Sequence, residues 1–161
     1  MELTDQILTF KFLHVLAVLV FFAGQGLEIP NLAFAARARH LYEVRAHLSM
    51  VRFAENVLIL PSAIAIPVFG WLPAWRADIS LGETWLSIAQ TLYFVALAVA
   101  LIYLRPFYLR MARRADTLPA DGAIPDDFRA DLRRPGPIVV GNVLGLALIG
   151  ILYLMVFQPW S

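Results

Sequence analysis

The sequence contains no cysteine, and Lys11 is the single lysine among its 161 residues. The absence of cysteine excludes disulfide bonds, thiolate metal sites and cysteine nucleophiles. The chain begins with the acidic segment MELTDQ and therefore lacks the positively charged region that opens a signal peptide. We expect the first apolar run to be retained as a helix. Internal repeats are also lacking, so the sequence gives no sign of a transporter built from inverted copies.

Apolar residues are in excess. They make up 60% of the chain, and the mean hydropathy is +0.71, whereas soluble domains are about 45–50% apolar. The excess lies in four runs of about 20 residues, the length with which a helix crosses a hydrocarbon core of about 30 Å. The sequence predicts an all-α integral membrane four-helix bundle with a single transmembrane domain, residues 1–161. The predicted helices cover residues 7–27, 53–72, 85–104 and 138–157.

Basic residues are concentrated in two segments between these helices, about 28–52 and 105–137, which together hold eleven of the thirteen. By the positive-inside rule we expect both segments in the cytoplasm. Both termini then lie outside, in a multi-pass protein of the cell inner (plasma) membrane. Tryptophans at the outer helix ends are expected to act as interfacial anchors; they are Trp71, Trp75, Trp85 and Trp160.

The first basic segment has apolar residues at helical spacing and predicts a helix at the cytoplasmic membrane face. The second mixes charges with proline and glycine. There the sequence predicts one short helix that starts at Asp126, is stopped by Pro135 and is otherwise surrounded by loop. Gly141 and Gly145 form a GxxxG pattern in the fourth helix, which favours close packing of a helix from the same chain or from a second copy.

One histidine lies well inside the first apolar run. On a 3.6-residue period His14, Gln25 and Glu28 share a face, which we expect to point into the bundle. An ionisable side chain inside the membrane is a functional candidate, and histidine serves in metal and haem ligation and in proton transfer. The alternative is a hydrogen bond that ties two helices together. By depth, the expected neighbours of His14 are Gln90, Ser62 and Tyr153.

A second polar layer is expected nearer the cytoplasmic side, where Glu28 and Glu55 are predicted to pair with Arg52 and Arg105. Its expected members are Gln25, Glu28, Asn31, Glu55, Asn56, Arg105 and Asn142. The favoured interpretation of this layer is structural. His40 and His47 are expected on a solvated helix face, because their spacing of seven does not suit a zinc pair. The sequence predicts no catalytic residue.

The segment KFLHVLAVLVFFAG resembles the first helix of a superfamily of small membrane proteins. The superfamily includes HemJ-type protoporphyrinogen oxidases, CopD-like copper-resistance domains and predicted integral membrane proteins of domain of unknown function 2269. The matching residues of this helix are Lys11, Leu13, His14, Val15 and Gly24. Pro61 and Gly70 match the second helix, Trp85 and Leu86 begin the third, and the resemblance covers three of the four helices.

The resemblance to HemJ-type members implies that His14 ligates a b-type haem, opposite a lysine of the third helix. This chain has Ala89 and Gln90 at that place and no lysine, so the unknown-function branch is the better match. The leading hypothesis is an uncharacterised membrane protein of HemJ/CopD-like type that binds haem b, or another metal, through His14. The alternative is a structural or accessory subunit of a membrane complex, or a homodimer, without cofactor. The expected partners are the lipid bilayer and another membrane protein or a second copy, not nucleic acid.

Overall fold

The computed structural model describes residues 3–76, 80, 82–119 and 123–159, and within these ranges the chain is helical with no strand. This confirms the all-α prediction. Among the described residues, four helical stretches are long and apolar enough to cross a membrane. In chain order the elements are α1 (Leu3–Arg37), α2 (Leu41–Phe53), the π-helical η1 (Ala54–Ile59), α3 (Leu60–Arg76), α4 (Thr84–Val99), the π-helical η2 (Ala100–Leu104), α5 (Arg105–Thr117), α6 (Asp126–Leu132) and α7 (Pro135–Phe157).

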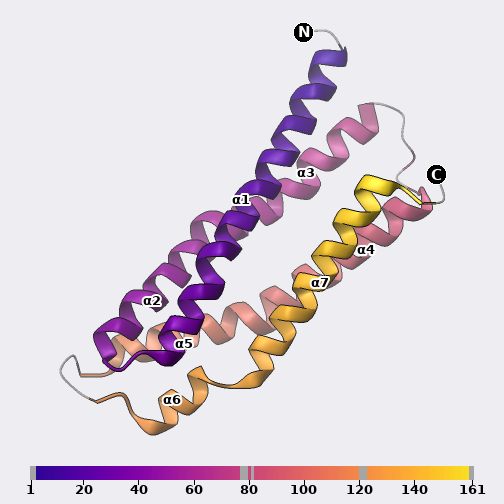
Figure 1. Cartoon of the computed structure of the whole chain (residues 1–161). Coiled ribbons are helices and arrows are strands. Elements are labelled where there is room, and N and C mark those ends of the chain that lie inside the picture. The colour runs from indigo at the N-terminus through magenta and orange to yellow at the C-terminus, as the bar shows by residue number, and fades with distance from the viewer. Residues whose placement is uncertain (1–2, 77–79, 81, 120–122, 160–161) are drawn as a thin grey trace.

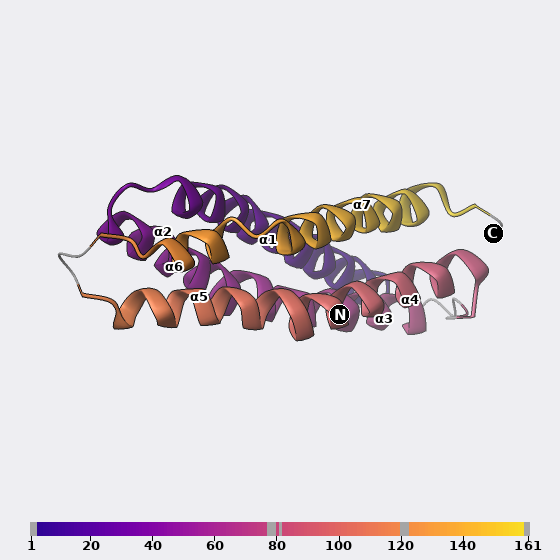
Figure 2. The ribbon, with the colours of Figure 1, turned by 90° about the horizontal axis from the view of Figure 1, so that it is seen from below.

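The helices are arranged as two pairs. Helix α1 packs along α3, and α4 packs along α7. The pairs diverge toward the end that carries both termini and come together at the opposite end, where α2, α5 and α6 lie (Figure 1). Figure 2 shows α7 above α4, while α1 crosses behind them. We call the end formed by α2, α5 and α6 the arginine-rich end.

The main core of buried apolar side chains lies at the arginine-rich end. Phe128 of α6 is 0% exposed and packs with Leu41, Val44 and Leu48 of α2 and with Met111 of α5. Along α7, all of which the structure describes, just two residues are buried, Pro137 and Leu154. Water drives apolar side chains together at the arginine-rich end, whereas hydrocarbon solvates them in the membrane and makes burial unnecessary.

The helices extend beyond the apolar runs from which they were predicted. Helix α1 continues to Arg37, and α2, η1 and α3 follow one another without a break, as do α4, η2 and α5. The predicted loop is wrong at residues 111–117, which belong to α5. This part is helical because its apolar side chains pack against α2. The short helix from Asp126 is confirmed, but it ends at Leu132.

Two other predictions at helix positions are wrong. Pro135, expected to stop the short helix, begins α7, since a proline at the first helical position gives up no hydrogen bond. Trp85, expected as an interfacial anchor, is buried against other helices, whereas Trp71 and Trp75 are exposed. Trp160 lies outside the described residues.

Side chains satisfy backbone groups that the helices leave open. Pro67 has no N–H to donate to the carbonyl of Ala63, and the hydroxyl of Tyr93 in α4 donates to that carbonyl at 2.5 Å. At the start of α2, outside the apolar runs, a carboxylate oxygen of Glu43 accepts from the backbone N–H groups of Arg39 at 2.9 Å and His40 at 3.2 Å. These hydrogen bonds lower the pKa of Glu43.

Candidate functional site

His14 lies in the contact between α1 and α3. Its Nδ1 is 2.8 Å from the carbonyl oxygen of Ile66. Because a carbonyl only accepts, Nδ1 donates to it, and in the neutral imidazole Nε2 is then the nitrogen that carries the lone pair. The ring packs over Gly70, where an added Cβ would lie 3.0 Å from Nδ1 and 3.1 Å from Cε1. Glycine at position 70 therefore makes room for the imidazole.

The expected neighbours of His14 bond elsewhere. Ser62 of α3 is buried. Its hydroxyl donates to the carbonyls of Leu58 and Ile59 in η1, the element that runs directly into α3. Gln90 accepts from the indole N–H of Trp71 at 3.2 Å. Tyr153 is 55% exposed, and its ring packs on Phe157 at 4.7 Å between centroids. The contacts given for Ser62 and Tyr153 are thus with residues other than His14.

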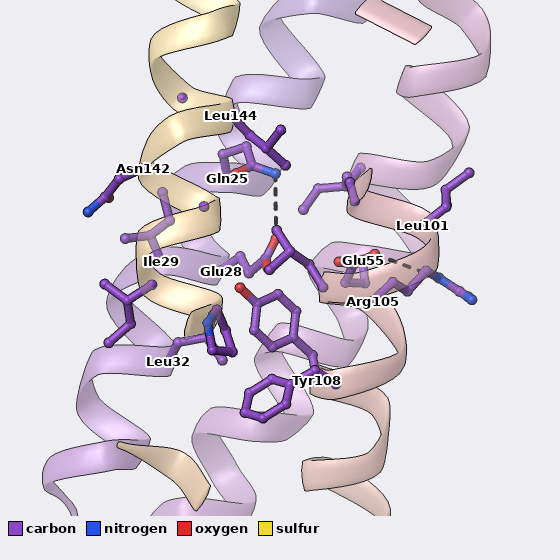
Figure 3. A pocket seen from close by; sticks show the side chains of 18 of the residues that line it. Gln25, Glu28, Ile29, Leu32, Glu55, Leu101, Arg105, Tyr108, Asn142 and Leu144 are labelled. Carbon is purple, nitrogen blue, oxygen red and sulfur yellow. Dashed lines mark hydrogen bonds and ion pairs between the residues drawn. The ribbon is translucent and has the colours of Figure 1, made fainter. Parts of the chain in front are cut away.

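A cavity of about 300 Å³ lies between the two helix pairs, on the arginine-rich side of His14. Its walls come from α1, η1, α3, α4, η2, α5, α6 and α7, and most of the lining side chains are apolar (Figure 3). Gly141 and Gly145 line it. A Cβ on either glycine would meet nothing within 4 Å, so the predicted close helix approach within the chain is wrong at this GxxxG. The two glycines widen the cavity instead.

Polar side chains gather partway along this cavity, with apolar lining on both sides of them. Glu28 of α1 is 4% exposed and Glu55 of η1 is 7% exposed. The amide of Gln25 donates to Glu28 at 3.5 Å. Tyr108 of α5 directs its hydroxyl toward Glu28 (Figure 3). The structure thus brings together much of the second polar layer, in a cavity wall rather than at a solvated boundary.

Of the two arginines expected to pair with the glutamates of this layer, Arg105 does so and Arg52 does not. The Nε of Arg105 lies 3.7 Å from a carboxylate oxygen of Glu55, and an Nη donates to Asn56 at 2.9 Å. Arg52, expected as a partner of the glutamates, instead binds Asp116 at 2.7 Å. That part of the prediction is wrong because Arg52 extends toward α5. Among the described residues, Arg105 Nε is the buried side-chain nitrogen or oxygen without a hydrogen bond.

Metal-binding geometry is limited. Among the described residues, no three His, Asp or Glu side chains come together as a metal site. His47 bonds to Asn31 at 2.8 Å, and His40 stacks on Tyr42. His14 is thus a single candidate donor rather than part of a set.

Sequence reasoning did not single out Tyr93 or Tyr108. A usable signal existed for Tyr108, which follows Arg105 by three residues and so shares its helix face. For Tyr93 the signal was Pro67, whose missing N–H demands a donor from another helix.

The fold and the cavity define a multi-pass helical membrane protein with a mostly apolar cavity between its helices, in which a few polar side chains cluster. Residues 8–159 match the family described as predicted integral membrane protein (DUF2269), and the chain belongs to this family. The expected likeness to the unknown-function branch is therefore confirmed. The kinship with HemJ-type and CopD-like proteins stays a prediction. No curated protein and no solved structure matches the chain.

Proposed function

We propose that this membrane protein binds an amphipathic molecule from the bilayer in the cavity between its two helix pairs. The observation that carries the proposal is the layout of the cavity: apolar walls along most of its length and a cluster of buried polar side chains partway along it. Small-molecule sites are typically about 300–1,000 Å³ and mostly apolar, with a few convergent polar groups. The cavity of about 300 Å³ lies at the lower end of that range.

The test is labelling by a decanol analogue with a terminal diazirine, on protein in lipid nanodiscs. Wild-type protein should be labelled at residues of the cavity wall. Gly145→Leu, which fills the cavity, should lose at least 80% of this labelling. The matched control is Leu146→Phe, which adds bulk one residue away on an exposed position. Equal labelling of the two variants, or labelling of exposed residues alone, would refute the proposal.

A second candidate function is binding of b-type haem through His14, and the observation in its favour is the Nδ1 hydrogen bond to Ile66. Metal-ligating histidines almost always donate their other ring N–H to a carbonyl, a carboxylate or water, which fixes the ring and its tautomer. The donor nitrogen would be Nε2. A bound haem would supply redox chemistry. This chain's contribution would be to orient the imidazole through Ile66 and Gly70.

An absorption spectrum of protein purified from haem-sufficient cells, before and after dithionite, tests this candidate. A Soret band and a reduced α band, both lost in His14→Ala, would support it. A folded, colourless protein would leave His14 as a tie between α1 and α3, which its two contacts already explain. That outcome favours the alternative of a cofactor-free subunit of a membrane complex or a homodimer.

We propose further that the protein lies in the plasma membrane with its arginine-rich end in the cytoplasm and both termini outside. Since the chain has no cysteine, single cysteines report orientation directly. Ser80→Cys should react with an impermeant maleimide added to intact cells, and Thr117→Cys should react only after the cells are opened. The reverse pattern would refute the orientation.

A further inference from the structure

Two carboxylates from different parts of the chain meet at the polar cluster partway along the cavity. Glu28 belongs to α1 and Glu55 to η1, and both are more than nine-tenths buried. In Figure 3 Glu55 lies between Glu28 and Arg105, and the guanidinium of Arg105 extends away from Glu28. Arg105 is therefore the partner of Glu55, at 3.7 Å, rather than of Glu28.

Glu28 has no counter-charge of its own. Among the described residues, no basic side chain lies within 4.0 Å of its carboxylate. Arg134 also reaches the cavity wall, but its side chain is 68% exposed and its Nε lies 3.3 Å from Asp131. The bond from Gln25 is neutral and long, at 3.5 Å. One carboxylate of the cavity is thus unmatched.

An unmatched carboxylate at this depth is costly unless it takes up a proton or a cation comes to it. We propose that the ligand of the cavity carries a cationic head, a primary ammonium or similar group, which binds at Glu28 with its apolar chain along the cavity. This inference rests on the proposed function and names its ligand class. Tyr108 and Gln25 flank the head position and offer further oxygen acceptors to an N–H donor.

The apolar part of the cavity fits the chain of such a molecule. From Glu28 the wall continues along α1 to Phe21, seven residues or about 10 Å away at the helical rise per residue. On the facing helices it continues to Leu97 of α4 and Leu148 of α7. The head therefore lies toward the arginine-rich end and the chain toward the middle of the apolar spans.

The experiment compares three photoreactive probes on the full-length protein in phosphatidylcholine nanodiscs. The probes share a decyl chain with a terminal diazirine and differ in their head, which is an amine, a hydroxyl or a sulfate. Mass spectrometry of peptides locates and quantifies the label. We expect the amine to label the cavity wall around Phe21 and Leu148 at least tenfold more than the hydroxyl or sulfate probe.

Three variants assign the effect to Glu28. Glu28→Gln should reduce amine labelling about tenfold and leave hydroxyl labelling unchanged, which also shows that the cavity is intact. Gln25→Lys keeps the carboxylate but supplies a cation beside it, and should abolish the preference for the amine in the same way. Glu83→Gln, at the start of α4 and outside the cavity wall, is the control and should behave as wild type.

The outcomes separate the two proposals. Absence of cavity labelling by every probe would refute the proposed binding function itself. Equal labelling by the three heads, or an amine preference that survives both Glu28→Gln and Gln25→Lys, would leave the binding function standing and overturn the cationic head. Adding phosphatidylethanolamine to the nanodiscs distinguishes the source of the ammonium group. Displacement of the amine probe indicates a lipid head, and undiminished labelling indicates a free amphipathic amine.

Discussion

Replacing Gly24 by alanine should force α1 away from η1, against which it packs. A Cβ at position 24 would lie 2.6 Å from Cγ1 of Ile59, 3.1 Å from Cβ of Leu58 and 3.4 Å from the Ile59 backbone nitrogen. Carbon atoms pack best at about 3.5–4.0 Å, so the first contact is roughly 1 Å too short. Ile59 is buried and β-branched, and its Cγ1 has little freedom to move.

The expected cost follows from this overlap. Overpacking of a close contact destabilises a protein by about 1–3 kcal/mol, while alanine gains up to about 1 kcal/mol over glycine in helix propensity. Gly26→Ala is the matched control, because it lies in the same helix and its Cβ would meet nothing within 4 Å. Helix propensity cancels between the two variants, so Gly24→Ala should be less stable than Gly26→Ala by about 1–3 kcal/mol.

The assay is reversible unfolding in mixed micelles with increasing SDS, followed by tryptophan fluorescence and circular dichroism. The free energy of unfolding is compared among wild type, Gly24→Ala and Gly26→Ala. Equal values for the two alanine variants would refute the close contact between α1 and η1, and with it the proposed position of Glu28 relative to Glu55.

Three further predictions concern other contacts. Tyr93→Phe should lower the free energy of unfolding by about 0.6–2 kcal/mol, the range for hydrogen bonds in membranes; a double-mutant cycle with Pro67→Ala measures the coupling, and additive effects would contradict it. Phe128→Ala should cost about 3–5 kcal/mol as a core truncation and speed proteolysis of the arginine-rich end, whereas the exposed control Phe157→Ala should have little effect on proteolysis. At pH values above the ordinary glutamate pKa, Glu43 should protect the amides at the start of α2 from hydrogen exchange, and this protection should be lost as the pH falls through its lowered pKa. Amide hydrogen exchange at the start of α2 measures the effect. A Glu43→Gln variant with the same pH dependence would disprove the assignment.

Much of the fold was predictable because the bilayer imposes a simple rule. Backbone polar groups in hydrocarbon must bond within the segment, so an apolar run of about 20 residues has to be a helix. The helical period also placed Gln25 and Glu28 on one face of α1. The ends of the helices were not predictable in this way. Residues 111–117 look like loop in isolation, yet they form a helix because α2 and α6 cover their apolar side chains.

By itself, the sequence determined the class of the protein: an all-α membrane protein, its four apolar runs and the polar residues that they carry. Those follow from composition and period, which are local properties. Only the tertiary structure decided which polar residues meet. In the tertiary structure His14 hydrogen-bonds to a backbone carbonyl of α3, and Arg105 pairs with Glu55. Glu28 lies in the cavity wall without a cation beside it. The reason is that the separation of the two helix pairs depends on side-chain packing between helices far apart in the chain, which no local pattern encodes.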